Sequence, residues 1–165
     1  MFKAIISLFL WPIWFLYLLI ILPVFLIFIL IVNKKYFHYF LRPMSYFFCL
    51  LGGQLIKQTG IIPDPKDGPY LYLFNHQSLF DHFVIGTYIN HYVTAVAKHE
   101  HLSYPLWGQV AKFYGIVPIN RTNIKKALSS LKVVEDSIVN DKASVLIAPE
   151  GTRTRNGDLG VFKKG

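Results

Sequence analysis

A chain of 165 residues holds one domain and at most a short appendage. Hydrophobic residues make up 53% and aromatic residues 16%, both high for a soluble domain. Lys and Arg outnumber Asp and Glu by 17 to 9, so the formal net charge of +8 predicts an anionic partner, such as phospholipid headgroups. Nucleic acid is a poor alternative, because the basic residues form no recognisable module interleaved with aromatics.

The single cysteine, Cys49, excludes an internal disulfide, and the chain has no Cys/His spacing of the kind that binds zinc. The neighbours of Cys49 are apolar, which indicates a buried or lipid-facing thiol rather than a nucleophile. We therefore expect no metal site.

The N-terminal segment 4–32 contains no charged residue. As one helix it would be about 43 Å long, more than the roughly 30 Å of a bilayer's hydrocarbon core. Pro12 and Pro23 are expected to kink it. The run is too long for a cleaved signal peptide, and no small-residue cleavage site follows it. We predict a membrane anchor, which could either cross the bilayer or dip in and return.

Basic and aromatic residues follow the anchor. Lys34, Lys35 and Arg42 place the rest of the chain on the cytoplasmic face by the positive-inside rule. Segment 36–57 is rich in Tyr and Phe, which suit the headgroup boundary. We expect a second helix that packs on the first and holds the remaining chain against the membrane.

Turn residues at 63–69 mark a boundary, so we predict membrane-anchoring helices at 1–59 and a catalytic domain at 60–165. Beyond it, short apolar runs alternate with helical patterns, which indicates an α/β fold. The strands are expected at 70–74, 92–97, 115–119 and 144–148, and the helices at 83–88, 102–114 and 124–139. The last helix is amphipathic, with an apolar side made of Ala127, Leu128, Leu131, Val134 and Ile138.

Polar clusters follow three of these strands, namely Asn75-His76, Asn120-Arg121 and Glu150 to Arg153. In open α/β sheets, ligands bind beyond the carboxyl ends of the strands. The three clusters can therefore converge on one site.

His76 and Asp81 stand five positions apart. Neither a helix, which would separate them by about 140°, nor a strand brings them together, but a turn before a helix that starts near Asp81 could. A histidine held by a carboxylate is a general base. With six histidines in the chain, the alternative is a histidine that caps a turn. Ser78 lacks the G-x-S-x-G elbow of a serine nucleophile.

Arg121 and Arg153 stand at strand ends, where a guanidinium can grip a phosphate, although an ordinary surface arginine is the alternative. Glu150 would either pair with an arginine or bind a substrate hydroxyl. Gly151 lets the backbone approach a ligand closely, and Thr152 lies in the same turn. We predict that Arg121, Glu150, Gly151, Thr152 and Arg153 form one set, which binds a phosphate and a hydroxyl of the substrate.

Four motifs in this order, N-H-Q-S-L-F-D, G-I-V-P-I-N-R, P-E-G-T-R and F-K-K-G, resemble those of the glycerolipid acyltransferases, and most closely the 1-acyl-glycerol-3-phosphate acyltransferases. The resemblance covers roughly residues 70–165. It implies a mixed sheet flanked by helices, after hydrophobic membrane helices. It also implies that His76 is the catalytic base, that Asp81 is its partner, and that Arg121, Glu150, Gly151 and Arg153 bind the glycerol phosphate of the acceptor.

The chain departs from the family pattern in two places. The family usually continues with one more motif, an apolar stretch with a proline on a further strand. This sequence stops at Gly165, so we expect the C-terminal part of the domain to be missing. The second motif reads I-N-R, where an acidic residue often precedes the arginine.

The resemblance implies acyl transfer from acyl-coenzyme A or acyl-carrier protein to the free hydroxyl of a lysophosphatidate. The product would be phosphatidate, made in phospholipid biosynthesis, with no cofactor beyond the acyl donor. Partners would be membrane lipids and the lysophospholipid. The alternatives are another lysophospholipid or glycerol 3-phosphate as acceptor, lipid-to-lipid transacylation, and a non-catalytic membrane-anchored member of the family.

Overall fold

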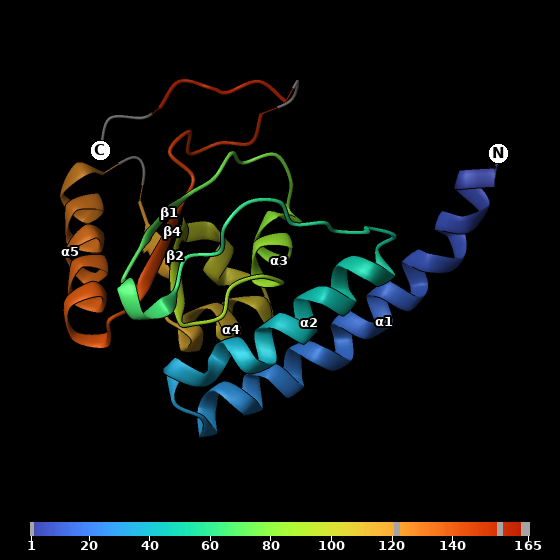
Figure 1. Cartoon of the computed structure of the whole chain (residues 1–165), viewed down its shortest axis with the longest axis horizontal. Coiled ribbons are helices and arrows are strands. Elements are labelled where there is room, and N and C mark those ends of the chain that lie inside the picture. The colour runs from blue at the N-terminus through green and yellow to red at the C-terminus, as the bar shows by residue number, and fades with distance from the viewer. Residues whose placement is uncertain (1, 121–122, 155–156, 163–165) are drawn as a thin grey trace.

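The computed structural model describes residues 2–120, 123–154 and 157–162. Two long helices, α1 and α2, precede an alternation of strands and shorter helices (Figure 1). The helices are α1 (Phe2–Ile31), α2 (Phe37–Leu51), α3 (Asp81–Gly86), α4 (Trp107–Tyr114) and α5 (Ile124–Asp141), and the strands are β1 (Leu71–Leu73), β2 (Val93–Lys98), β3 (Val117–Ile119) and β4 (Ser144–Ile147). Short 3₁₀ helices occupy Lys34–Tyr36, Pro65–Asp67 and His99–Ser103.

The four strands form one sheet in the order β1-β4-β2-β3, and every pair is parallel. The predicted α/β class is confirmed, but we expected a mixed sheet and the described strands form a parallel one. The reason lies in the connections, because a helix between successive strands returns the chain to the end where the previous strand began. The loops after the strands therefore meet at one edge of the sheet.

Helices cover both faces of the sheet. On one face, Val134 of α5 packs against Val117 and Val145. On the other, Val93 and Leu146 pack with Ile85 of α3. Figure 1 shows α5 on one side of the strands and α3 and α4 on the other, with α1 and α2 beyond them.

The anchor segment shares its core with the sheet domain. Phe25 of α1 and Phe37 of α2 are 2% and 1% exposed and belong to one buried cluster with Tyr92 and Tyr114. Towards its N-terminus the same helix is open, and Leu8 is 71% exposed. By length and composition Ile6–Ile31 could cross a membrane, a criterion that soluble core helices and signal sequences also meet. The C-terminal half of α1 is thus a structural part of the domain.

Two expected details differ in the structure. Leu128 and Leu131 of α5 are 58% and 38% exposed although both were placed on the apolar side. The side of α5 that meets the sheet runs through Ser130, whose hydroxyl donates a 2.7 Å hydrogen bond to the carbonyl of Pro118, and Val134, so the two leucines lie beside this contact. The helix expected from residue 102 begins at Trp107, after a 3₁₀ turn. Pro105 explains the break, since proline disfavours helical backbone in the residue before it.

Candidate active site

The loop between β1 and α3 folds the carboxylate of Asp81 back onto His76. The Nδ1 atom of His76 lies 2.7 Å from Oδ2 of Asp81. The same oxygen accepts hydrogen bonds from the backbone N–H groups of Gln77, at 2.8 Å, and Ser78, at 3.0 Å. The His76 and Asp81 side chains are 19% and 16% exposed. The predicted turn is therefore present, and it brings His76 and Asp81 into contact.

These contacts determine which nitrogen of His76 can act. An oxygen that already accepts two backbone N–H groups serves as an acceptor, so the third bond requires a proton on Nδ1. In the neutral ring, Nε2 is then unprotonated and can take a proton from a bound group. Asp81 also opens α3, where a carboxylate is favoured by the unpaired N–H groups of the first turn.

The turn has its own internal support. The hydroxyl oxygen of Ser78 accepts a hydrogen bond of 3.1 Å from the N–H of Phe80. The carbonyl of Phe80 in turn accepts from the N–H groups of Phe83 and Val84, both at 2.9 Å. Ser78 therefore shapes the loop, a structural role that fits the missing nucleophile elbow.

The loop after β4 lies directly against this turn. β4 neighbours β1 in the sheet, and the N–H of Thr154 donates a 2.9 Å hydrogen bond to the carbonyl of His76. Gly151 has a positive φ of 66° and donates its N–H to Ala148 at 3.0 Å, which makes the tight turn that brings the chain back. Thr152 and Arg153 are exposed beside it. The first and third polar clusters are thus brought together.

Glu150 is 3% exposed, and its Oε2 accepts a 2.9 Å hydrogen bond from the N–H of Gly160. Within the described residues this partner is a backbone amide, and the pairing of Glu150 with an arginine or a substrate hydroxyl stays a prediction. Its other oxygen, Oε1, is buried with no hydrogen-bond partner there. Glu150 fixes the returning segment to the site and keeps one acceptor atom for a donor that is still to be supplied.

Arg121 falls outside the described residues, as do Lys163 and Lys164. Its neighbour Asn120 follows β3, whose carboxyl end lies at the same edge of the parallel sheet as those of β1 and β4. The side chain of Asn120 accepts a 3.0 Å hydrogen bond from the N–H of Asn123.

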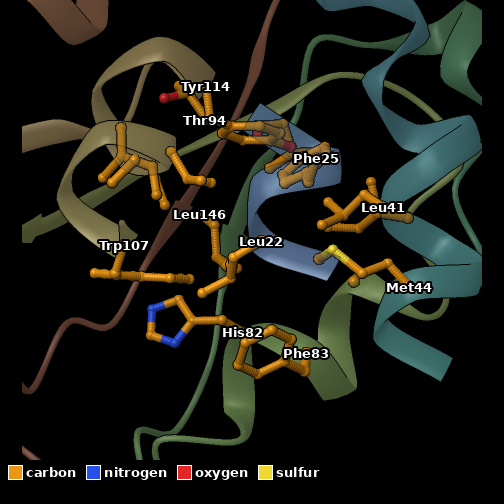
Figure 2. Close-up of a pocket in the computed structure, with 17 residues that line it drawn as sticks. Leu22, Phe25, Leu41, Met44, His82, Phe83, Thr94, Trp107, Tyr114 and Leu146 are labelled. Atoms are coloured by element: carbon orange, nitrogen blue, oxygen red, sulfur yellow. The ribbon is translucent and has the colours of Figure 1, made fainter. Parts of the chain in front are cut away.

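An apolar pocket lies between the sheet and the helices. Figure 2 shows His82 and Phe83 at one end of it and Phe25 and Tyr114 at the other. The pocket has walls from α1, α2, α3, α4 and the sheet. It thus has the lining that an alkyl chain requires.

Sequence reasoning missed His82, whose ring centroid lies 6.0 Å from that of His76. Burial lowers the pKa of His82 from its ordinary value near 6.5, a proton on the neighbouring His76 would lower it further, and Asp81 acts in the opposite direction. The imidazole of His82 is therefore neutral near pH 7, and it lies between the pocket and His76. The available signal was its position directly after Asp81, but the expected helix began one residue later, at 83.

Comparison with known proteins identifies the family of the chain. The acyltransferase family matches residues 55–165. The chain is 40% identical over 95 residues to a 1-acyl-sn-glycerol-3-phosphate acyltransferase of Cocos nucifera, covering 58% of this chain and 31% of the relative. It is 34% identical over 116 residues to the enzyme of that name from Borreliella burgdorferi, covering 70% of this chain and 46% of the relative. It is 29% identical over 133 residues to the human beta form, covering 81% of this chain and 46% of the relative.

The chain spans less than half the length of these curated relatives. No solved structure matches it. The family match extends over most of the chain and contains both polar clusters of the site, so the chain belongs to the acyltransferase family.

Proposed function

We propose that this chain carries the catalytic base of an O-acyltransferase that acylates the free hydroxyl of a lysophosphatidate to give phosphatidate. The His76–Asp81 pair is the observation that carries the proposal, because it leaves Nε2 of a neutral imidazole ready to accept a proton. The names of the relatives favour lysophosphatidate as the acceptor.

The reaction is a direct transfer. Nε2 of His76 takes the proton of the acceptor hydroxyl as its oxygen attacks the carbonyl carbon of the acyl thioester, and Asp81 stabilises the imidazolium. The carbon–sulfur bond then breaks, and the leaving thiolate takes the proton from His76. The donor is an acyl thioester of coenzyme A or of a carrier protein. General-base help of this kind is typically worth about 10²- to 10⁴-fold in rate.

The acceptor's phosphate would bind to Arg153 and Arg121, with Thr152 offering a hydroxyl donor and Gly151 letting the backbone approach closely, and Glu150 would accept from the glycerol. The Thr154 to His76 hydrogen bond supports this assignment, because it holds the loop that contains Arg153 beside the base. Binding at the phosphate would then place the hydroxyl near His76, and orientation would supply part of the rate.

The acyl chain would enter the apolar pocket, whose His82 wall lies beside His76. The exposed side of α1, with Leu8 and Phe15, would lie in the lipid, where both substrates partition, and the site would face the cytoplasm. Binding of membrane lipids and a place in phospholipid biosynthesis follow from the same proposal.

An acceptor competition assay tests this function. The protein in detergent receives labelled acyl-coenzyme A with lysophosphatidate, glycerol 3-phosphate and lysophosphatidylcholine in equal amounts, and the labelled products are separated. Labelled phosphatidate as the main product is expected. A different main product would overturn the assignment of the acceptor, and no product with either coenzyme A or carrier-protein donors would favour the non-catalytic alternative.

A further inference from the structure

Four aromatic rings join the anchor helices to the catalytic loop. Trp14 of α1 stacks on Phe80, with ring centroids 5.8 Å apart and planes at 29°. Phe48 of α2 lies 4.7 Å from Trp14 and 5.3 Å from Phe80, and it stacks on Phe83 at 3.6 Å. We call Trp14, Phe48, Phe80 and Phe83 the aromatic bridge.

Phe80 connects this bridge to the chemistry. It directly precedes Asp81, its N–H is held by Ser78, and its carbonyl accepts the first hydrogen bonds of α3. A shift of Phe80 therefore moves the carboxylate that orients His76. The space around the Phe80 ring is also closed on the α2 side, because a Cβ on Gly52 would lie 3.0 Å from it.

The other end of the bridge lies in the exposed part of α1. Trp11 and Phe15, which flank Trp14 in the sequence, are 56% and 55% exposed, and Trp11 packs edge-on against Trp14 at 5.3 Å. Trp14 itself is less exposed and stacks on Phe80 of the catalytic loop. The helix that would meet the lipid is thus in contact with the residue next to Asp81.

We propose that Trp14 and Phe80 are positioning residues for the acyl transfer, and that through their ring contact α1 holds the loop in which Asp81 bonds His76. This inference rests on the proposed function. Since a displacement of about 1 Å in a reacting group can cost on the order of 10²-fold in rate, loss of the contact should act on kcat rather than on acceptor binding.

The first test compares Trp14→Ala with Trp14→Phe in detergent micelles, with folding checked by circular dichroism. Trp14→Ala is expected to lower kcat by roughly 10-fold or more while KM for the acceptor changes less than about 2-fold. Trp14→Phe keeps a ring against Phe80 and should restore most of kcat. An unchanged kcat in folded Trp14→Ala, or a KM effect alone, would overturn the proposal.

A second variant applies if Trp14→Ala does not fold. Gly52→Ala leaves every ring in place but presses on Phe80, and its backbone φ of −74° accepts an alanine. It should lower kcat in the same direction. Combining Phe80→Ala with Trp14→Ala should cost no more than Phe80→Ala alone, because both remove one contact, and additive losses would contradict the bridge.

A readout without activity separates this inference from the proposed function. The amides of Gln77 and Ser78 donate to Asp81, so their hydrogen exchange reports whether the loop is held. Trp14→Ala should speed their exchange, whereas Phe9→Ala, which removes a 67% exposed ring from the same helix, should leave it at the wild-type rate. If Trp14→Ala speeds the exchange but the wild-type protein shows no acyl transfer, the proposed function is refuted and the aromatic bridge is kept. If Trp14→Ala and Phe9→Ala exchange at the same rate, the aromatic bridge is refuted.

Discussion

The carbonyl of His76 accepts a 2.9 Å hydrogen bond from the N–H of Thr154, and the two residues lie in the loops that follow the neighbouring parallel strands β1 and β4. This bond joins the loop that contains the base to the loop that contains Glu150 and Arg153. Residues far apart in the sequence thereby form one site, and the bond uses only backbone atoms, so the side chains of both loops remain available for substrate.

The carboxylate of Asp81 should be needed for catalysis more than for folding. In Asp81→Asn the amide oxygen can take the place of Oδ2 and keep the bonds from Gln77, Ser78 and Nδ1 of His76, but it has no negative charge to stabilise the imidazolium that forms during transfer. We expect kcat to fall by about 10²- to 10⁴-fold with a nearly unchanged Tm. Steady-state kinetics and a thermal melt measure both, and a kcat within a few-fold of wild type would contradict the role of Asp81.

Arg153 should act on acceptor binding. We expect Arg153→Ala to raise KM for lysophosphatidate by about 10-fold or more, because a charge-assisted contact to phosphate is lost. Lys66→Ala is the control, since Lys66 is an exposed cation in a separate turn. Equal KM values in Arg153→Ala and Lys66→Ala would show that Arg153 does not bind the phosphate.

Gly160 should be required for stability because a Cβ there would lie 2.8 Å from Oε2 of Glu150. Gly160→Ala would break the hydrogen bond and leave a buried carboxylate without its donor, which costs about 1–3 kcal/mol. Urea unfolding measures the loss. Leu159→Ala, at a 63% exposed neighbour, should unfold close to wild type, and an equal loss in both variants would mean that the bond to Glu150 contributes nothing specific.

The unfolding free energy should fall as the pH falls below about 6.5, because burial lowers the pKa of both His82 and His91 in the folded protein. In the window between the folded and unfolded pKa values, the unfolded chain binds more protons, so acid favours unfolding. For His82, the neighbouring charges on His76 and His101 lower the pKa further, whereas Asp81 raises it.

Urea midpoints at pH 7.5 and 5.5 measure this dependence. In His82→Phe the buried imidazole is replaced by a phenyl ring, which does not titrate, so the difference between the two midpoints should shrink. An equal or larger difference would show that His82 is not a source of the acid sensitivity.

The sequence predicted the parts of the site that depend on local chain geometry. The five-residue spacing of His76 and Asp81 required a turn before a helix, and the alternation of strands with helices placed the loops after β1 and β4 at one edge. It could not show that Thr154 bonds to His76, because that bond depends on which strands become neighbours in the sheet.

The rest depends on tertiary packing. A charge-free run predicts an anchor, but it does not show that Phe25 enters the core of the domain while Leu8 stays open. Likewise, helical periodicity put Leu128 on the apolar side, although the side of α5 that meets the sheet runs through Ser130 and Val134. Arg121, in the second cluster, stays a prediction.

The central claim is that Nε2 of His76 is the base of an acyl transfer, and thiol release from acyl-coenzyme A tests it most directly. The protein in detergent is assayed with and without lysophosphatidate, beside His76→Ala and beside His99→Ala at an exposed histidine. We predict release that requires the acceptor, falls by about 10²- to 10⁴-fold in folded His76→Ala, and persists in His99→Ala. Acceptor-dependent release at the wild-type rate in His76→Ala would contradict the claim.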